Sequence, residues 1–360
     1  MNFYRNYFSE LKKAKVRLVV NLFHFDIPIE FLKQKGFENK QIIEKYVEYA
    51  KVCFDNFNDL VDDWATFNEP MANVDSQYLN GHHYPKEKNL YKSVQVFYNM
   101  MVAHAKVVNL FNKNYKKLNQ KITIIISLNP AQVRDKNNPL DVLAANKCDL
   151  LVNFSQLDPV LNGKFDSQLI SILKEENLLP IYNQNELNEI ANAKIDYISL
   201  NYYQPIRVKE IKKNSNHIMS KFFDFYDWPE KRINPSRGWE IYPKAIYDIA
   251  IIIKNKYNNV AWIISENGIG VQNEDQFRDK NNEINDQYRI DFISEHLEGL
   301  QKAISEGANC FGYSLWTFID CWSWSNAYKN RYGLIEYNLE NDKFINKKSS
   351  YEFKKLIESK

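Results

Sequence analysis

The 360-residue chain carries 47 basic and 45 acidic side chains, which give a formal net charge of +2. This balance excludes a general nucleic-acid-binding protein, because neutralising many phosphates requires a dense basic surface. Hydrophobic residues make up 44% of the chain, which is enough for a large core in a soluble protein.

The N-terminal segment 1–15 predicts an amphipathic helix, with one face formed by Phe3, Tyr4, Tyr7, Phe8 and Leu11. It has no apolar core followed by a small-residue cleavage site, so it does not resemble a secretory signal. No apolar run in the sequence approaches the roughly 18 residues of a membrane span. We therefore expect a cytoplasmic protein with no membrane partner.

The four cysteines are far apart in the sequence and form no C-x-x-C pair. This spacing argues against a disulfide framework and against a metal site, and it favours reduced thiols. We expect no metal and no cofactor.

Six short β-rich segments recur along the chain, and each ends in polar or aromatic residues. In order they are VRLVVNLFHFD from Val16, WATFNEP from Trp64, ITIIISLNP from Ile122, IDYISLNYY from Ile195, AWIISENG from Ala261 and CFGYSLWTFID from Cys310. Amphipathic helical stretches such as 41–57 and 287–307 separate most of them, and this alternation predicts a parallel sheet covered by helices. Polar residues at the end of strand after strand are typical of a (β/α)8 TIM barrel. A doubly wound sheet would gather its chemistry at one switch point.

A closed barrel of this type needs eight strands, and the sequence predicts six. We expect one α/β domain over residues 1–360, a TIM barrel truncated at its N-terminus to about six strand–helix units. Two absent strands would leave long open sheet edges. The chain alone is then expected to be poorly stable and nearly inactive, and a complementing N-terminal fragment is an expected partner.

Two glutamates, Glu69 in FNEP and Glu266 in SENG, stand at the ends of apolar strands. A carboxylate in such a place is costly unless it is paired or has a chemical role. Either one alone could cap a helix or form an ion pair. Two of them at strand ends of one barrel favour a shared site, and paired carboxylates are the apparatus of glycoside hydrolysis.

Six motifs in order, NLFHFDIP, WATFNEP, SLNYY, GWEIYP, SENG and SLWTFIDCWSWSNAYKNRYG, resemble those of a family 1 glycoside hydrolase along essentially the whole chain. The resemblance implies a (β/α)8 barrel that cleaves β-glycosides with retention, with Glu69 as acid/base and Glu266 as nucleophile. Retention requires carboxyl groups about 5–5.5 Å apart, and the ionised nucleophile raises the pKa of the acid.

The resemblance also implies a set of substrate-binding residues. They are Asn68 at the sugar 2-hydroxyl, His24 near the 3-hydroxyl, Tyr203 as hydrogen-bond partner of Glu266, Asn201 as a binding asparagine, and Trp316 and Trp324 as walls of the sugar site. Tryptophan faces suit the C–H face of a pyranose. Two further residues of the family, a glutamine on its first strand and an arginine on its second, have no match in this sequence.

The segment CWSWSNAYKNRYG, from Cys321, is expected to lie beside the 6-position of the sugar. Family members that act on plain glucosides have a glutamate where this chain has Ser323, and a carboxylate there would repel a phosphate dianion, whereas a hydroxyl can donate to it. Members that act on 6-phosphosugars share Ser323 and Tyr332 but have a lysine at the position of Asn330. We expect Ser323, Tyr332 and the neighbouring Lys329 to bind the phosphate.

The sequence therefore predicts a retaining glycosidase for 6-phospho-β-glucosides or 6-phospho-β-galactosides, with a small phosphorylated disaccharide or β-glycoside as substrate. Two alternatives stay open at this point. One is a β-glucosidase that acts on unphosphorylated sugars, and the other is an inactive truncated remnant.

Overall fold

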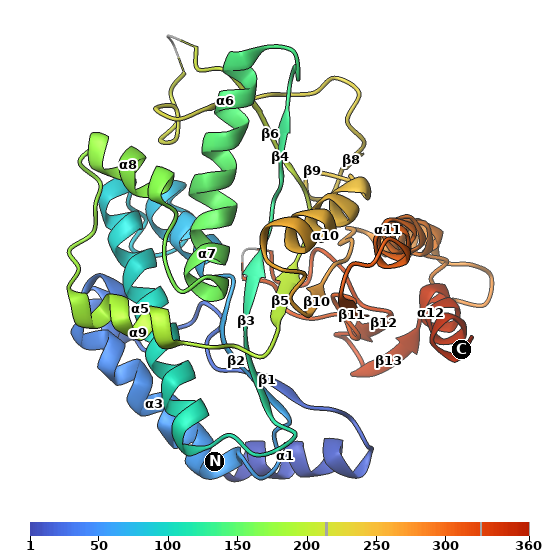
Figure 1. Cartoon of the computed structure of the whole chain (residues 1–360). Coiled ribbons are helices and arrows are strands. Elements are labelled where there is room, and N and C mark those ends of the chain that lie inside the picture. The colour runs from blue at the N-terminus through green and yellow to red at the C-terminus, as the bar shows by residue number, and fades with distance from the viewer. Residues whose placement is uncertain (213–214, 325, 360) are drawn as a thin grey trace. The chain divides into compact units, whose positions relative to one another are not determined.

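The computed structural model describes residues 1–212, 215–324 and 326–359, and these form two compact units (Figure 1). Unit 1 comprises Met1–Ser199 and Val208–Phe225, and unit 2 comprises Leu200–Arg207 and Tyr226–Lys360. The division falls within strand β5 (Ile198–Asn201). The expectation of one domain over 1–360 stays a prediction.

The sheet of unit 1 contains the parallel strands β1 (Val19–Asn21), β2 (Asp63–Asn68) and β3 (Lys121–Ser127), with β5 following β3 in the strand order. All six residues of β2 are buried, as expected for a parallel strand covered on both faces. Parallel neighbours need a crossover, and the helices α3 (Gln41–Phe57) and α5 (Leu90–Asn114) supply two of them.

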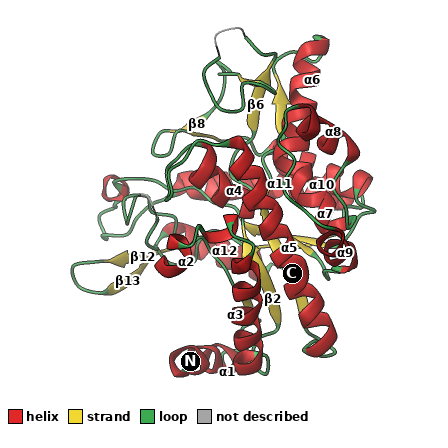
Figure 2. Ribbon diagram, turned by 90° about the vertical axis from the view of Figure 1, so that its left-hand side faces the viewer, coloured by secondary structure: helices red, strands yellow, loops and turns green. Residues whose placement is uncertain are grey.

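Helix α3 forms because its apolar residues recur at helical spacing, so that one stripe faces the core. That stripe consists of Ile42, Ile43, Tyr46, Ala50, Phe54 and Phe57. Helices α3, α5 and α9 (Gln184–Asn192) lie side by side (Figure 1), and α1 (Asn2–Lys13) lies at the end of α3 (Figure 2). The rings of Phe8 and Phe57 join α1 to α3, with centroids 5.5 Å apart, and the N-terminal helix predicted from the sequence is confirmed.

The remaining elements of unit 1 are short. The helices are α2 (Ile29–Lys33), α4 (Pro70–Val74), α6 (Pro139–Cys148), α7 (Ser155–Leu161) and α8 (Ser167–Glu175). Single helical turns occur at Gly36–Glu38, Asp75–Leu79 and Asp149–Phe154. A small separate sheet has the order β4 (Ala131–Val133), β6 (Ile206–Lys209) and β7 (Asp224–Phe225), and the division between the units also falls within β6.

In unit 2 the sheet order is β5, β10 (Trp262–Glu266) and β11 (Cys310–Tyr313), and β10 pairs with β11 in parallel. The helices are α10 (Lys244–Lys256), α11 (Gln287–Ser305) and α12 (Lys348–Glu358), with a helical turn at Glu274–Phe277. Two hairpins complete the unit, β8 (Ile233–Asn234) with β9 (Trp239–Glu240) and β12 (Ile335–Asn338) with β13 (Lys343–Asn346); Figure 2 shows the second. Each of the six predicted β-rich segments thus contains a strand of the main sheet.

Unit 2 contains a cluster of buried charged side chains, which ties helix α11 to the segments around it. The Arg289 guanidinium donates to Asp286 at 2.8 Å and to Glu274 at 2.5 Å. The Lys347 ammonium donates to Glu274 at 2.6 Å and to Asp320 at 3.0 Å. Burial raises the pKa of Glu274 above its ordinary value, and the charges of Arg289 and Lys347 oppose that rise. Two buried cations are thereby matched with three carboxylates.

Arg289 also holds the backbone of two loops. It donates to the carbonyl of Ile269 at 2.6 Å and to the carbonyl of Tyr332 at 2.9 Å. Val271 and Arg331 pair in an antiparallel bridge between the same two segments. The segment that follows β10 is therefore fixed to the loop that ends at Tyr332.

We predict that Arg289→Met lowers the free energy of unfolding by about 3–5 kcal/mol, because it leaves Asp286 buried without a cation and Glu274 with Lys347 alone. The matched control is Arg232→Met, which removes an exposed arginine paired with Glu295 and should cost about 1 kcal/mol or less. Urea denaturation of the three chains at neutral pH measures both differences. Similar small losses in the two variants would contradict the structural role given to Arg289.

Candidate active site

In unit 1, Glu69 stands directly after the end of β2 in a left-handed backbone conformation, with φ of 46°. Its N–H donates to the carbonyl of Ile125 at 2.9 Å, which anchors it to β3. Pro70 then begins α4. For a residue other than glycine, this conformation costs on the order of 1–2 kcal/mol of free energy. Such strain is concentrated at functional sites.

Asn68 and His24 lie together beside this position. The Asn68 amide Nδ2 donates to His24 Nε2 at 3.3 Å, and Asn68 is almost fully buried. Burial lowers the pKa of His24, and the charge of Asp26 only partly opposes this. His24 is therefore a neutral imidazole near pH 7.

In unit 2, Glu266 is the last residue of β10. The Tyr203 hydroxyl donates to the Glu266 carboxylate Oε2 at 2.8 Å, and the Tyr202 N–H donates to its carbonyl at 3.0 Å. Asn201 is fully buried, and its Oδ1 accepts a 2.8 Å hydrogen bond from Ser265 Oγ. The end of β5 therefore orients the carboxylate at the end of β10.

Asn267 is a residue whose role the sequence reasoning missed. Its amide donates to the Tyr202 carbonyl at 2.8 Å, its Oδ1 accepts from the Tyr313 hydroxyl at 2.8 Å, and its carbonyl accepts from the Trp316 N–H at 3.0 Å. A Cβ on Gly268 would stand 2.0 Å from the Trp316 carbonyl oxygen, so only glycine permits this approach. The available signal was the pair Asn267 and Gly268, which follows the glutamate in SENG. These two residues hold Trp316 against the end of β10.

The loop after β11 carries the residues expected to bind phosphate. Ser323 and Ala327 exchange two backbone hydrogen bonds of 2.9 Å. Trp324 is 45% exposed, and its ring meets Trp322 edge-on with centroids 5.5 Å apart. The Lys329 side chain is exposed to solvent.

Tyr332 is buried at the end of this loop, and its ring packs on the backbone at Gly270, where a Cβ would lie 2.2 Å away. Burial raises the pKa of Tyr332; the positive charges of Arg237 and Arg289 oppose this, and the negative charge of Glu266 adds to it. The Tyr332 hydroxyl is therefore within electrostatic reach of Glu266, and at neutral pH it is a hydrogen-bond donor.

The residues predicted to form one site are distributed over the two units. Unit 1 contains His24, Asn68 and Glu69, and unit 2 contains Asn201, Tyr203, Glu266, Trp316, Ser323, Trp324, Lys329 and Tyr332. The pairing of Glu69 with Glu266 stays a prediction.

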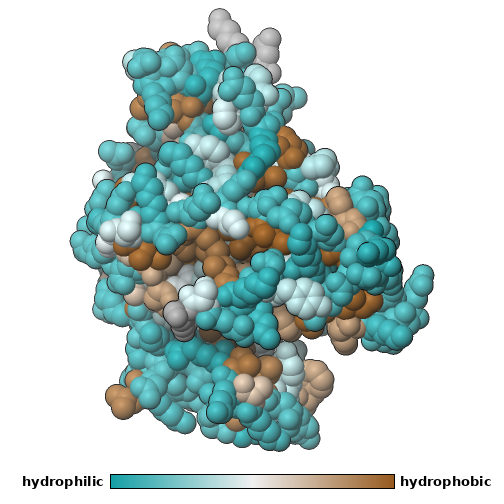
Figure 3. Space-filling model, turned by 90° about the vertical axis from the view of Figure 1, so that its right-hand side faces the viewer, coloured by the Kyte–Doolittle hydropathy of each residue, from teal (hydrophilic) through white to brown (hydrophobic). Residues whose placement is uncertain are grey.

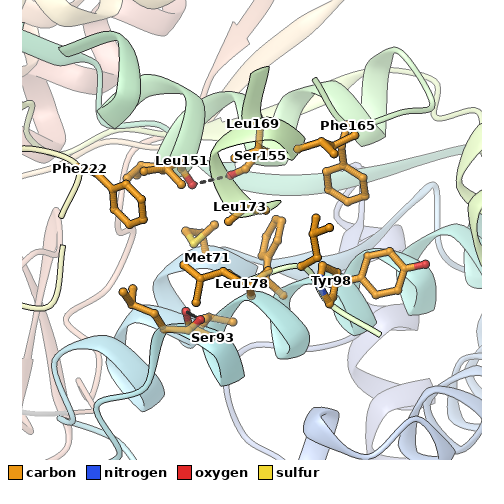
Figure 4. Close-up of a pocket in the computed structure, with 18 of the residues that line it drawn as sticks. Met71, Ser93, Tyr98, Leu151, Ser155, Phe165, Leu169, Leu173, Leu178 and Phe222 are labelled. Carbon is orange, nitrogen blue, oxygen red and sulfur yellow. Dashed lines mark hydrogen bonds between the residues drawn. The ribbon is translucent and has the colours of Figure 1, made fainter. Parts of the chain in front are cut away.

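Other residues line an apolar cavity of about 210 Å³ in unit 1 (Figure 4). Leucine, phenylalanine and methionine side chains dominate its lining. Ser93 and Ser155 also line it, and their hydroxyls donate to the carbonyls of Leu90 and Leu151, about one helical turn earlier in the chain. The cavity therefore suits an apolar molecule and not a sugar.

Unit 2 also exposes large hydrophobic side chains, among them Phe311, Phe318 and Trp322. The face of the molecule in Figure 3 likewise shows hydrophobic side chains gathered amid a largely hydrophilic surface.

Among residues 1–212, 215–324 and 326–359, no three or more His, Cys, Asp or Glu side chains are grouped so as to hold a metal ion.

Within the same described ranges, no helix has the length and apolar character needed to span a bilayer.

The model of the family described as "Glycosyl hydrolase family 1" matches residues 1–360. The "6-phospho-beta-glucosidase GmuD" of Bacillus subtilis is 42% identical over 99% of this chain and 77% of that protein. A "6-phospho-beta-galactosidase" of Leptotrichia buccalis is 37% identical over 100% of this chain and 80% of that protein.

Solved structures agree with this result. A β-glucosidase from Exiguobacterium marinum superimposes with a TM-score of 0.90 at 26% identity, over 100% of this chain and 79% of that one. A family 1 β-glucosidase from Thermotoga maritima superimposes with a TM-score of 0.88 at 27% identity, over 99% of this chain and 77% of that one. These matches confirm the predicted α/β fold of the TIM-barrel type. The chain belongs to glycosyl hydrolase family 1.

Proposed function

We propose that this chain is a retaining β-glycosidase that hydrolyses 6-phospho-β-glucosides or 6-phospho-β-galactosides. The relatives named for these two activities support the substrate class. The observation that carries the proposal is the fixed position of Arg331 and Tyr332, at the end of the segment expected to bind phosphate, against the segment that follows Glu266. A phosphate group bound by this loop would lie near the candidate nucleophile.

In the proposed reaction the Glu266 carboxylate attacks the anomeric carbon while Glu69 protonates the leaving oxygen. The carbon–oxygen bond to the aglycone breaks, and a covalent glycosyl–enzyme forms. Glu69 then takes a proton from a water molecule that displaces Glu266, so the sugar leaves with its original configuration. The hydrogen bond from Tyr203 holds the attacking carboxylate in one orientation.

Polar groups in unit 1 would bind the sugar hydroxyls. We assign this role to the Asn68 amide and to the neutral His24 imidazole, which the 3.3 Å hydrogen bond holds in one arrangement. In unit 2, Asn201, Trp316 and Trp324 complete the proposed sugar site. A neutral imidazole can both donate and accept, which suits a hydroxyl.

The proposed preference for phosphorylated substrates depends on hydrogen-bond donors near the 6-position of the sugar, where members that act on plain glucosides have a glutamate. A phosphate monoester carries about −1.5 to −2 charges at pH 7 and accepts strong hydrogen bonds. The Ser323 hydroxyl, the protonated Tyr332 hydroxyl and the Lys329 ammonium are the donors that we assign to it. A β-glucosidase acting on unphosphorylated sugars is the alternative, and Asn330 at the position of the family's lysine favours it.

A cytoplasmic location is part of this proposal. Cys53, Cys148, Cys310 and Cys321 are all free thiols, which is typical of a reducing compartment. The complementing N-terminal fragment stays a prediction.

We predict that Glu266→Ala abolishes hydrolysis of dinitrophenyl β-glucoside 6-phosphate, because no nucleophile remains. Added azide should then attack from the vacated face and yield the α-glycosyl azide. In Glu69→Ala the nucleophile is intact, so azide should yield the β-glycosyl azide instead. Nuclear magnetic resonance of the products distinguishes the two anomers. Glu295→Ala, which removes an exposed carboxylate, is the control and should keep normal turnover. The same anomer from both variants would refute the assigned roles.

We predict that the chain prefers nitrophenyl β-glycoside 6-phosphates over the plain glycosides, and that Ser323→Glu reverses this preference. The new carboxylate repels the phosphate dianion and removes a charge-assisted hydrogen bond of about 1.5–3 kcal/mol, equal to roughly 10–100-fold in kcat/KM. Ser323→Ala is the matched control and should lose only the hydrogen bond. Equal or faster hydrolysis of the plain glycosides by the unmodified chain would favour the β-glucosidase alternative.

A further inference from the structure

Arg207 and Glu240 form an ion pair that is largely shielded from solvent in unit 2. The guanidinium Nη2 donates to one oxygen of the Glu240 carboxylate at 2.6 Å, and Nε donates to the other at 2.9 Å. The two side chains are 13% and 6% exposed. The guanidinium carbon also lies 4.0 Å from the ring centroid of Trp228 and 5.0 Å from that of Tyr242. A two-pronged ion pair packed on aromatic rings has little freedom to move.

This ion pair joins β9 to the segment that follows β5. Glu240 belongs to β9, and Arg207 lies six residues after the end of β5. Two further hydrogen bonds connect the same parts of the chain. The Glu240 N–H donates to Gln204 Oε1 at 3.3 Å, and the Tyr202 hydroxyl donates to the Tyr242 carbonyl at 2.7 Å. The position of β9 beside the end of β5 is therefore well determined.

Trp239 is the neighbour of Glu240 on β9, and it packs against Tyr203, with ring centroids 5.4 Å apart. Successive side chains of a strand point to opposite sides, so Glu240 can bind Arg207 while Trp239 faces Tyr203. The Tyr203 hydroxyl donates to the Glu266 carboxylate Oε2 at 2.8 Å. The ion pair thus determines where Trp239 stands, and Trp239 limits the positions that the Tyr203 ring can take.

We propose that the Arg207–Glu240 ion pair positions the candidate nucleophile, Glu266. It holds Trp239 against Tyr203 and so fixes the hydrogen bond from the tyrosine hydroxyl to the nucleophile carboxylate. Both members act through Tyr203, so they are positioning residues and not catalytic ones. This assignment rests on the proposed function of the site and adds a means of orienting its nucleophile.

The hydrogen bond that the ion pair secures has a consequence for the pH dependence of the reaction. A hydrogen bond to a carboxylate favours its ionised form, and the ionised form is the one that attacks the anomeric carbon. Loosening this bond makes the carboxylate easier to protonate. The pH at which kcat/KM falls on the acid side of its profile should therefore move upward when the ion pair is lost.

The test uses the double variant Arg207→Met/Glu240→Leu. Removal of one partner alone would leave a buried charge and endanger folding, whereas apolar replacement of both partners is often tolerated. The substrate is whichever of nitrophenyl β-glucoside and its 6-phosphate the unmodified chain hydrolyses faster. We expect kcat to fall about tenfold, since a hydrogen bond to a charged group is loosened and not removed, with KM within about twofold. The acid side of the pH profile should move upward by about half a pH unit or more.

Tyr203→Phe separates positioning from a general structural role. Without the tyrosine hydroxyl the ion pair has no hydrogen bond left to secure, so Arg207→Met/Glu240→Leu should cause no further loss of kcat in that background. Losses that multiply would show a structural role only and contradict the proposal. If the double variant does not fold, Arg207→Lys, which leaves neither charge unmatched, is compared in the same way and should give a smaller loss and the same upward pH shift.

The matched control is Arg278→Met/Glu336→Leu, which removes another partly buried arginine–glutamate pair of unit 2, with side chains 19% and 11% exposed. It should leave kcat and the pH profile unchanged. Unchanged kcat and an unchanged pH profile in Arg207→Met/Glu240→Leu would overturn the positioning role, while the proposed function would stand. An unmodified chain that hydrolyses neither substrate would overturn the proposed function and this assignment with it.

Discussion

The buried guanidinium of Arg289 is the constraint on which the site of unit 2 depends. A fully buried cation must be matched by carboxylates and carbonyl groups, or it destabilises the fold by several kcal/mol. Here the carbonyl of Ile269, three residues after Glu266, and the carbonyl of Tyr332 both accept from it. The loop beside the candidate nucleophile and the loop proposed to bind phosphate are therefore fixed by one side chain. Neither loop can shift without breaking a buried hydrogen bond to a charge.

The two candidate catalytic carboxylates, Glu266 and Glu69, are positioned in different ways. In unit 2 the candidate nucleophile Glu266 is held by side chains, because Tyr203 donates to its carboxylate and the Tyr203 ring packs beside Trp239. In unit 1, Glu69 is held by the backbone, in a left-handed conformation that its hydrogen bond to β3 secures. Preorganisation of this kind lowers the reorganisation required when the transition state forms.

Much of the fold could be predicted from the sequence, because alternation of β-rich and amphipathic segments is a local signal. Each of the six predicted segments contains a strand, and the motifs at their ends identified the family. The supporting residues were not predictable in this way. Arg289 lies in a helix whose sequence is largely polar, and its burial depends on carbonyls 20 and 43 residues away. Arg207 lies in a short strand whose sequence gives no sign of its ion pair with Glu240, 33 residues further along the chain.

Covalent trapping tests most directly the claim that unit 2 joins a glycosidase nucleophile to a phosphate-binding loop. The reagent is dinitrophenyl 2-deoxy-2-fluoro-β-glucoside 6-phosphate, whose fluorine slows breakdown of the glycosyl–enzyme. We expect inactivation with the mass gain of one fluorinated sugar phosphate, located by peptide mass spectrometry on Glu266, and much slower labelling by the same reagent without phosphate. A label on another residue, or equally fast labelling by the unphosphorylated reagent, would contradict the claim.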